Sequence, residues 1–211
     1  MKKNLVLLIG LLSCSMSLSA QYQKATEEQK KEIVSKISQA SGEMNTMQCD
    51  FTQVKELSFM DEKVTTEGKM YYKKANKIRW EIVKPVKSAF LMDGQNIRMI
   101  SGDNTNKIPV NSSKMFSGIS NVLIGCVSGS GLVDSPDFDS QFMVGKDDYQ
   151  IILIPKKKEI KDLFATIQLY VAKADSRIRS VELIDKDGDK MTITLKDVKV
   201  NTAIDDSIFS N

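Results

Sequence analysis

Histidine is absent from the 211-residue chain, and its absence limits the chemistry that the protein can perform. Histidine is the commonest general base, the usual partner of a serine nucleophile and the commonest transition-metal ligand. A hydrolase made from this sequence would need carboxylates alone or a Ser–Lys pair, and we find no group of residues arranged for either. We therefore expect no enzymatic activity and no cofactor.

Two charged motifs are typical of binding sites, but a simpler interpretation is favoured for each. Asp185, Asp187 and Asp189 resemble a calcium loop, yet no glutamate follows at the EF-hand position and Asp187-Gly188 is typical of a hairpin turn. We expect no metal site there. Lys156-Lys157-Lys158 suits anionic lipid headgroups, although a solvated loop is the more ordinary role for such a run.

The N-terminus is typical of an export signal. Lys2 and Lys3 precede an apolar stretch at 5–12, and Leu18-Ser19-Ala20 is a plausible cleavage site. We expect residues 1–20 to be a signal peptide and residues 21–211 to form one exported domain. The alternative is lipidation of Cys14 in Leu11-Leu12-Ser13-Cys14, which resembles a lipobox and would anchor the protein to a membrane. The short spacing between Lys3 and Cys14 favours the free form.

Charge and cysteine content narrow the range of partners. The chain has 30 basic and 27 acidic residues, and two of the basic ones belong to the signal, so it lacks the positive excess that nucleic-acid binding needs. We expect no nucleic-acid partner and a monomeric protein. Beyond the signal, Cys49 and Cys126 lie in apolar neighbourhoods, which leaves both buried thiols and a disulfide open.

Hydrophobic periodicity predicts two helices. Thr26 and Gln29 have the spacing of a capping box, and apolar residues follow at helical spacing, so we expect a helix from Thr26 to about Met47. Ser112 or Ser113 is expected to cap a second helix. Gly118 and Gly125 predict that this helix is short or irregular, and we expect loop 128–131 to be flexible enough to let it move as a flap.

Most of the remaining chain alternates with the period of a β-strand. Residues 77–82 are the clearest case, with apolar and charged side chains in strict alternation. Asp93-Gly94 predicts a hairpin. We expect two antiparallel meanders, one within 50–110 that includes strands at 64–72, 77–82, 90–92 and 96–100, and one with strands at 138–144, 149–154, 164–172, 177–184 and 191–200.

Several motifs, taken in order, resemble those of the LolA-like family of periplasmic lipoprotein carriers. They are Phe51-Thr52-Gln53, Gly68–Lys74, Arg79-Trp80-Glu81, Pro85, Met92-Asp93-Gly94, Leu153-Ile154-Pro155-Lys156, Arg177-Ile178, Asp187-Gly188-Asp189, Asn201 and Asp205–Phe209. One departure is Lys74-Ala75, where the family usually has Arg-Pro. Lysine lacks the planar fork of arginine, so a latch between helical lid and sheet would be weaker here or placed elsewhere.

The resemblance implies an α+β fold, in which a strongly curved, incomplete antiparallel β-barrel has helices covering its open side. It further implies an apolar cavity between sheet and helices that binds acyl chains. Ordinary core packing is the alternative role for each of the candidate residues, and the methionines among them suit a cavity of adaptable shape. The candidates are Phe51, Met70, Tyr72, Ile78, Trp80, Ile82, Phe90, Met92, Met115, Phe116 and Ile119.

The function that follows from the resemblance is transport without chemistry. The carrier would take acylated lipoproteins, or other lipids, from an inner-membrane ABC exporter and release them to an outer-membrane acceptor. Two alternatives are a membrane-anchored lipoprotein acceptor, or a lipid-sensing regulator, on the same fold. An envelope hydrolase is the third hypothesis, and it lacks a recognisable set of catalytic residues.

Overall fold

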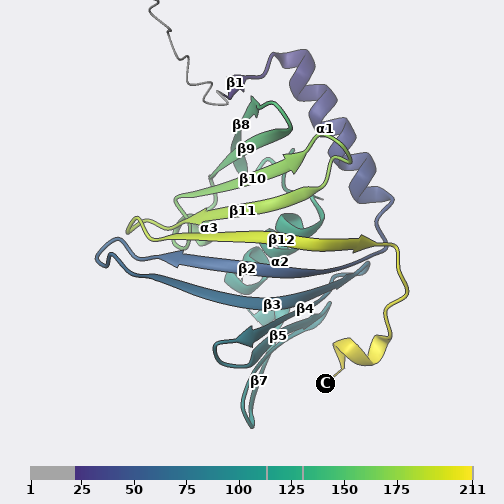
Figure 1. Ribbon diagram of the computed structural model, residues 1–211, viewed down its shortest axis with the longest axis vertical. Coiled ribbons are helices and arrows are strands. Elements are labelled where there is room, and N and C mark those ends of the chain that lie inside the picture. The colour runs from purple at the N-terminus through teal and green to yellow at the C-terminus, as the bar shows by residue number, and fades with distance from the viewer. Residues whose placement is uncertain (1–21, 113, 130, 211) are drawn as a thin grey trace, which may run out of the picture.

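A computed structural model describes residues 22–112, 114–129 and 131–210, and for residues 111, 114–117 and 119 it describes the backbone alone. Twelve antiparallel strands form one curved sheet that does not close into a barrel, in the order β1-β8-β9-β10-β11-β12-β2-β3-β4-β5-β6-β7. Helix α2 lies against one face of this sheet, and α1 runs beside its β8–β12 half (Figure 1). The expected α+β half-barrel is confirmed.

The first meander confirms the predicted strands. Asp93 Oδ1 accepts hydrogen bonds from the N–H groups of Gln95 (3.0 Å) and Asn96 (2.7 Å), and Gly94 has a positive φ of 90°, so these residues form the predicted hairpin turn. The strands are β2 (Thr46–Glu56), β3 (Lys63–Lys73), β4 (Lys77–Lys84), β5 (Ser88–Asp93), β6 (Asn96–Ser101) and β7 (Asn104–Pro109), followed by the short helix η1 (Val110–Ser112).

The second meander is also confirmed. Its strands are β8 (Phe138–Val144), β9 (Asp148–Pro155), β10 (Thr166–Ala172), β11 (Ile178–Ile184) and β12 (Lys190–Val200). Two pairings that the sequence patterns did not predict complete the sheet. Strand β12 pairs with β2 and joins the meanders into one sheet, while β1 (Gln23–Lys24) covers the outer edge of β8.

Helix α1 (Glu27–Gly42) begins at the predicted capping box. The N–H of Gln29 donates to Thr26 Oγ1 (3.2 Å), and the N–H of Thr26 donates to Gln29 Oε1 (2.9 Å). The predicted end near Met47 is wrong, because the helix stops at Gly42 and Met47 lies in β2. Strand pairing explains the difference, since residues 46–56 are hydrogen-bonded to β12 on one side and to β3 on the other.

Helix α2 (Lys114–Ser128) is a continuous helix of 15 residues, so the predicted short or irregular helix is wrong. Packing overrides the low helix propensity of glycine at Gly125, where a Cβ would come within 2.6 Å of the Leu132 Cβ. Gly129, with φ of 78°, ends the helix by donating its N–H to the Gly125 carbonyl (2.8 Å). Ser112 lies in η1, whereas Ser113 and Ser130 lie outside the described residues.

The three lysines at 156–158 do not form a plain loop. Lys158 begins the short helix α3 (Lys158–Lys161), and Lys157 is its N-cap residue. All three side chains are exposed, and each lies near an acidic partner: Lys156 with Asp139 (3.3 Å), Lys157 with Asp137 (2.8 Å) and Lys158 with Asp162 (3.2 Å).

Two clusters of buried side chains form the core. The first core cluster lies between α1 and strands β8–β11 and includes Ile33, Ile37 and Val181. The second core cluster covers the inner face of β2–β6 and includes Met70 and Ile78. Helix α2 contributes to both, with Val122 in the first cluster and Val127 in the second. The seam between the clusters therefore lies beneath α2.

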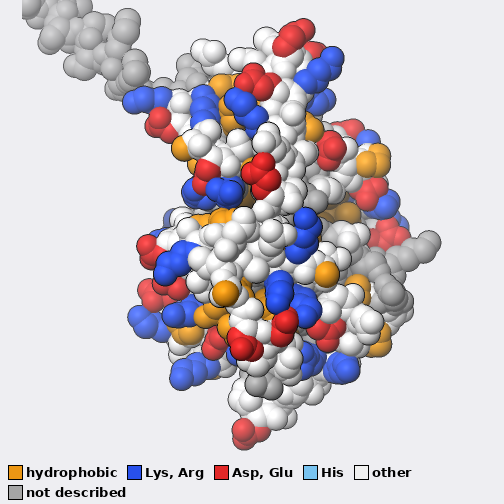
Figure 2. Space-filling view, turned by 90° about the vertical axis from the view of Figure 1, so that its right-hand side faces the viewer, with side chains coloured by type: hydrophobic (Ala, Val, Ile, Leu, Met, Phe, Trp, Pro, Cys, Tyr) orange, Lys and Arg blue, Asp and Glu red, His pale blue; other side chains and the backbone are white. Residues whose placement is uncertain are grey.

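The C-terminus crosses the outer face of the first meander as the short helix η2 (Asp206–Phe209). Arg98 donates to the carbonyls of Phe209 (2.5 Å) and Ser210 (2.7 Å), and Arg79 donates to that of Ile208 (3.1 Å). Phe209 is buried. On the side of the molecule shown in Figure 2, basic and acidic side chains are interspersed.

Candidate functional site

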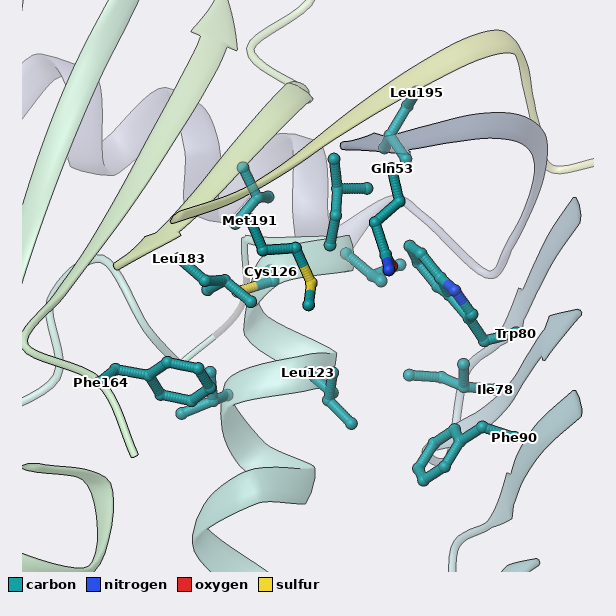
Figure 3. A pocket seen from close by; sticks show the side chains of 14 residues that line it. Gln53, Ile78, Trp80, Phe90, Leu123, Cys126, Phe164, Leu183, Met191 and Leu195 are labelled. Carbon is teal, nitrogen blue, oxygen red and sulfur yellow. The ribbon is translucent and has the colours of Figure 1, made fainter. Parts of the chain in front are cut away.

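An apolar cavity of about 220 Å³ lies at the seam between the two core clusters. Figure 3 shows α2 along one side and side chains from both meanders converging on the space. Members of both core clusters line it, which places the space where the two packed halves of the molecule meet. The lining residues are Gln53, Ile78, Trp80, Phe90, Val122, Leu123, Cys126, Val127, Phe164, Val181, Leu183, Met191, Ile193 and Leu195.

Strands β4 and β5 supply the aromatic wall. Ile78 and Trp80 project from one face of β4 because alternate residues of a strand share a face, and Trp80 is paired in register with Phe90. The Trp80 ring stacks on that of Phe51 with centroids 4.0 Å apart. Gly68 makes room for this stack, since a Cβ there would lie 2.3 Å from Phe51 Cζ.

Strands β11 and β12 supply the opposite wall, which the sequence motifs did not predict as part of the site. Val181 and Leu183 alternate on β11, and Met191, Ile193 and Leu195 alternate on β12. The alternation was visible in the sequence and indicated an apolar face. It did not indicate that β12 lies beside β2.

Helix α2 supplies the third side through Val122, Leu123, Cys126 and Val127. Burial raises the pKa of the Cys126 thiol to about 12, so the thiol stays protonated and is a poor nucleophile at neutral pH. Cys126 and Cys49 are both free, and the cavity holds no disulfide between them. The thiol therefore acts as a small apolar wall group.

The predicted acyl-chain residues occupy three kinds of position. Ile78, Trp80 and Phe90 line the cavity. Phe51, Met70, Tyr72 and Met92 are buried in the second core cluster, and half-buried Ile82 packs against it. Met115, Phe116 and Ile119 lie on α2, but their side chains are outside the described part of the chain.

The position that departs from the family motif contacts α1 rather than α2. Lys74 Nζ donates to the carbonyl of Gly42, the last residue of α1, at 3.1 Å. The next two residues, Ala75 and Asn76, have positive φ values of 72° and 63° in the turn between β3 and β4. With the Asn201 Nδ2 donor to the carbonyl of Glu43 (3.0 Å), the C-cap residue of α1, this bond holds the end of α1 to the sheet.

Asp185, Asp187 and Asp189, which resemble a calcium loop in sequence, lie in a turn that is stabilised by hydrogen bonds to backbone N–H groups. Asp185 Oδ1 accepts the N–H groups of Asp187 (2.9 Å) and Asp189 (3.0 Å), and Asp189 Oδ1 accepts the N–H of Ser58 (2.9 Å). Among the described residues, no three His, Cys, Asp or Glu side chains gather as metal ligands would. In the same part of the chain, no helix combines the length and apolarity needed to cross a membrane.

Comparison with known proteins identifies relatives over most of the chain. A family model described as "Outer membrane lipoprotein carrier protein LolA" matches residues 42–211. An outer-membrane lipoprotein carrier protein of Chromohalobacter salexigens is 24% identical over 144 residues, which are 68% of this chain and 65% of that relative. The chain therefore spans less than two thirds of that relative.

Solved structures align with most of the chain at low sequence identity. An uncharacterized conserved protein from Thermus thermophilus aligns with a TM-score of 0.53 and 12% identity over 86% of this chain and 92% of its own. A LolA superfamily protein from Nitrosomonas europaea aligns with a TM-score of 0.47 and 13% identity over 86% and 97%. At 12% identity, the likeness to the Thermus thermophilus protein shows a shared fold and nothing further.

Proposed function

The chain belongs to the LolA family of outer membrane lipoprotein carrier proteins, as its motifs predicted, and on this premise we propose that it carries acylated cargo with the acyl chains in the cavity beneath α2. The observation that supports this most directly is the cavity itself. Apart from Gln53, the side chains of its wall are apolar, and it lies at a seam in the core rather than at a catalytic cluster.

The physical need for such a carrier is large. An acyl chain gains roughly 0.8 kcal/mol for each CH₂ group that leaves water, so an exposed long chain costs on the order of 10 kcal/mol. A carrier offsets this cost by supplying apolar surface in place of a membrane. Aromatic Trp80 and Phe90 on one wall, with Leu183 and Met191 on the other, offer surface of this kind.

The cavity must widen to accept cargo. Its volume of about 220 Å³ is below the roughly 300–1,000 Å³ of ordinary small-molecule pockets, and a long acyl chain exceeds it. We propose α2 as the lid. Because α2 contributes Val122 to one core cluster and Val127 to the other, its displacement opens the seam without breaking a strand pairing.

The proposed route runs through the periplasm. After removal of residues 1–20, the protein takes acylated lipoproteins from an inner-membrane ABC exporter and gives them to an outer-membrane acceptor. The sequence Leu11-Leu12-Ser13-Cys14 supports one alternative, a membrane-anchored acceptor or lipid-sensing regulator on the same fold. Those residues lie outside the described part of the chain.

A release assay tests the carrier role. Purified protein is incubated with spheroplasts that retain labelled lipoproteins in the inner membrane, and the supernatant is analysed for a water-soluble complex. We expect lipoprotein to co-elute with the carrier in a ratio that saturates. Lipoprotein that stays in the membrane at every carrier concentration contradicts the proposal.

A further inference from the structure

Gln53 and Thr66 form a polar pair on an otherwise apolar surface. Met47, Cys49 and Phe51 are buried at alternate positions of β2, and Gln53 is the next residue in that alternation. Thr66 on β3 is paired in register with Gln53, so their side chains lie side by side on the same face. A polar pair thus interrupts the apolar inner face.

Neither side chain has a hydrogen-bond partner in the described part of the chain. Thr66 Oγ1 is buried there without one. The Gln53 amide makes no hydrogen bond within residues 22–112, 114–129 and 131–210. Buried polar groups without partners cost free energy, and most proteins avoid them or use them. Ile193, the neighbour of Gln53 on β12, offers only an aliphatic side chain.

The Gln53 amide faces the cavity. Figure 3 shows its polar end pointing into the space beside the Trp80 indole. Among the lining residues it alone has an amide, and the others are hydrocarbon, thioether, thiol or indole. A ligand in this cavity therefore meets one strong amide donor and acceptor, at a fixed place on β2.

The chemistry of an acyl linkage matches this pair. An acyl chain attached through an ester or amide ends in a carbonyl oxygen, which accepts hydrogen bonds from an amide NH₂ and from a hydroxyl. An alkyl chain without a carbonyl leaves both donors unpaired. We propose that Gln53 anchors the carbonyl of an ester- or amide-linked acyl chain, and that the buried Thr66 hydroxyl beside it, which does not line the closed cavity, joins it when the cavity widens.

This inference rests on the proposed acyl-chain carrier function and adds the chemical class of ligand that the cavity prefers. The test uses two lipids that differ only at the carbonyl: palmitoyl lysophosphatidylcholine, an ester, and hexadecyl lysophosphatidylcholine, its ether analogue. Affinities are measured by calorimetry below the micelle concentration, for the wild type, Gln53→Leu and Thr66→Val. Gln141→Leu, an exposed glutamine on β8, is the matched control.

We expect the wild type to bind the ester about 3- to 10-fold more tightly than the ether, which is the range of one or two neutral hydrogen bonds. Gln53→Leu and Thr66→Val each weaken ester binding and leave ether binding unchanged, and Gln141→Leu changes neither. Unchanged ether binding also shows that the variants keep an intact cavity.

Two results would contradict the proposed contact between Gln53 and the acyl carbonyl without contradicting the carrier function. One is a wild type that binds ester and ether equally, with Gln53→Leu unaffected. The other is an equal loss of both ligands in Gln53→Leu, which assigns the residue a structural role. A wild type that binds neither lipid contradicts the carrier function itself.

Discussion

The indole ring of Trp80 stacks on the phenyl ring of Phe51, with centroids 4.0 Å apart and 29° between the ring planes. Phe51 is buried in the second core cluster, whereas half-buried Trp80 lines the cavity. The only tryptophan of the chain therefore connects the rigid sheet to the proposed binding space. Its environment reports on the cavity without an added probe.

Filling the cavity should abolish binding and preserve the fold. Leu123 projects from α2 into the space, so Leu123→Trp places a large ring where an acyl chain would lie. We expect at least about a tenfold loss of affinity for palmitoyl lysophosphatidylcholine by calorimetry, with a stability change within the roughly 1–3 kcal/mol of core overpacking. Val86→Trp, at an exposed position, is the control. Binding that survives in Leu123→Trp places the site elsewhere.

The rate at which iodoacetamide alkylates Cys126 should depend steeply on pH, because the thiol is buried. Its raised pKa of about 12 means that the thiolate fraction grows about tenfold for each pH unit from pH 7 to pH 10, where a free cysteine would level off near pH 9. The measurement is iodoacetamide labelling of the mature protein in the Cys49→Ala background, and added acyl lipid should slow it. A plateau near pH 9 would show that the cavity admits water freely.

The C-terminal segment should stabilise the sheet without affecting binding. Phe209 is 2% exposed and lies on the outer face, where Arg98 donates to its carbonyl and Arg79 donates to that of Ile208. Phe209→Ala should lower the free energy of unfolding by about 3–5 kcal/mol in urea titrations. Lipid affinity should stay unchanged, because Trp80 projects from the opposite face of β4. A loss of affinity in a folded Phe209→Ala protein contradicts this separation of faces.

The mass of the exported protein tests whether its N-terminus is free or lipidated. Intact-mass measurement of the exported protein should give a chain that begins at Gln21 without lipid. That start leaves Tyr22 in place, whose hydroxyl donates to the Asp148 carboxylate at 2.9 Å and ties the new N-terminus to β9. A mass that corresponds to diacylated or triacylated Cys14 would favour the anchored acceptor instead.

Local patterns predicted much of the fold because they depend on neighbouring residues. The alternation at 77–82 predicted β4 and the face that Trp80 occupies, and Asp93-Gly94 predicted its hairpin. The predicted end of α1 and the predicted length of α2 were wrong because local patterns do not include contacts between residues that are distant in the sequence. Met47 pairs with a neighbouring strand, and Leu132 packs against Gly125. Both are tertiary contacts, and the helix propensity of a residue does not take them into account.

Of the residues that line the cavity, the sequence predicted only Ile78, Trp80 and Phe90, which belong to one wall. Alternation indicates which side chains share a face, but it does not indicate which strands are neighbours. The pairing of β12 with β2 places Ile193 beside Gln53, although the two residues are far apart in the sequence. The residues Met191, Ile193 and Leu195 were therefore not predicted as part of the site. Gln53 was noted only as part of a motif, because its missing hydrogen bonds are a property of the packed structure.

The most direct test of acyl-chain binding beneath α2 is the emission of Trp80 during titration with lysophosphatidylcholines of increasing chain length, with glycerophosphocholine as the headgroup control. We predict a saturable change in emission with an affinity that rises several-fold for each added pair of methylene groups, since each buried CH₂ contributes up to roughly 0.8 kcal/mol. The headgroup alone should have no effect. Emission that ignores every acyl chain, in a protein whose thermal stability is also unchanged by the lipids, would contradict the carrier function.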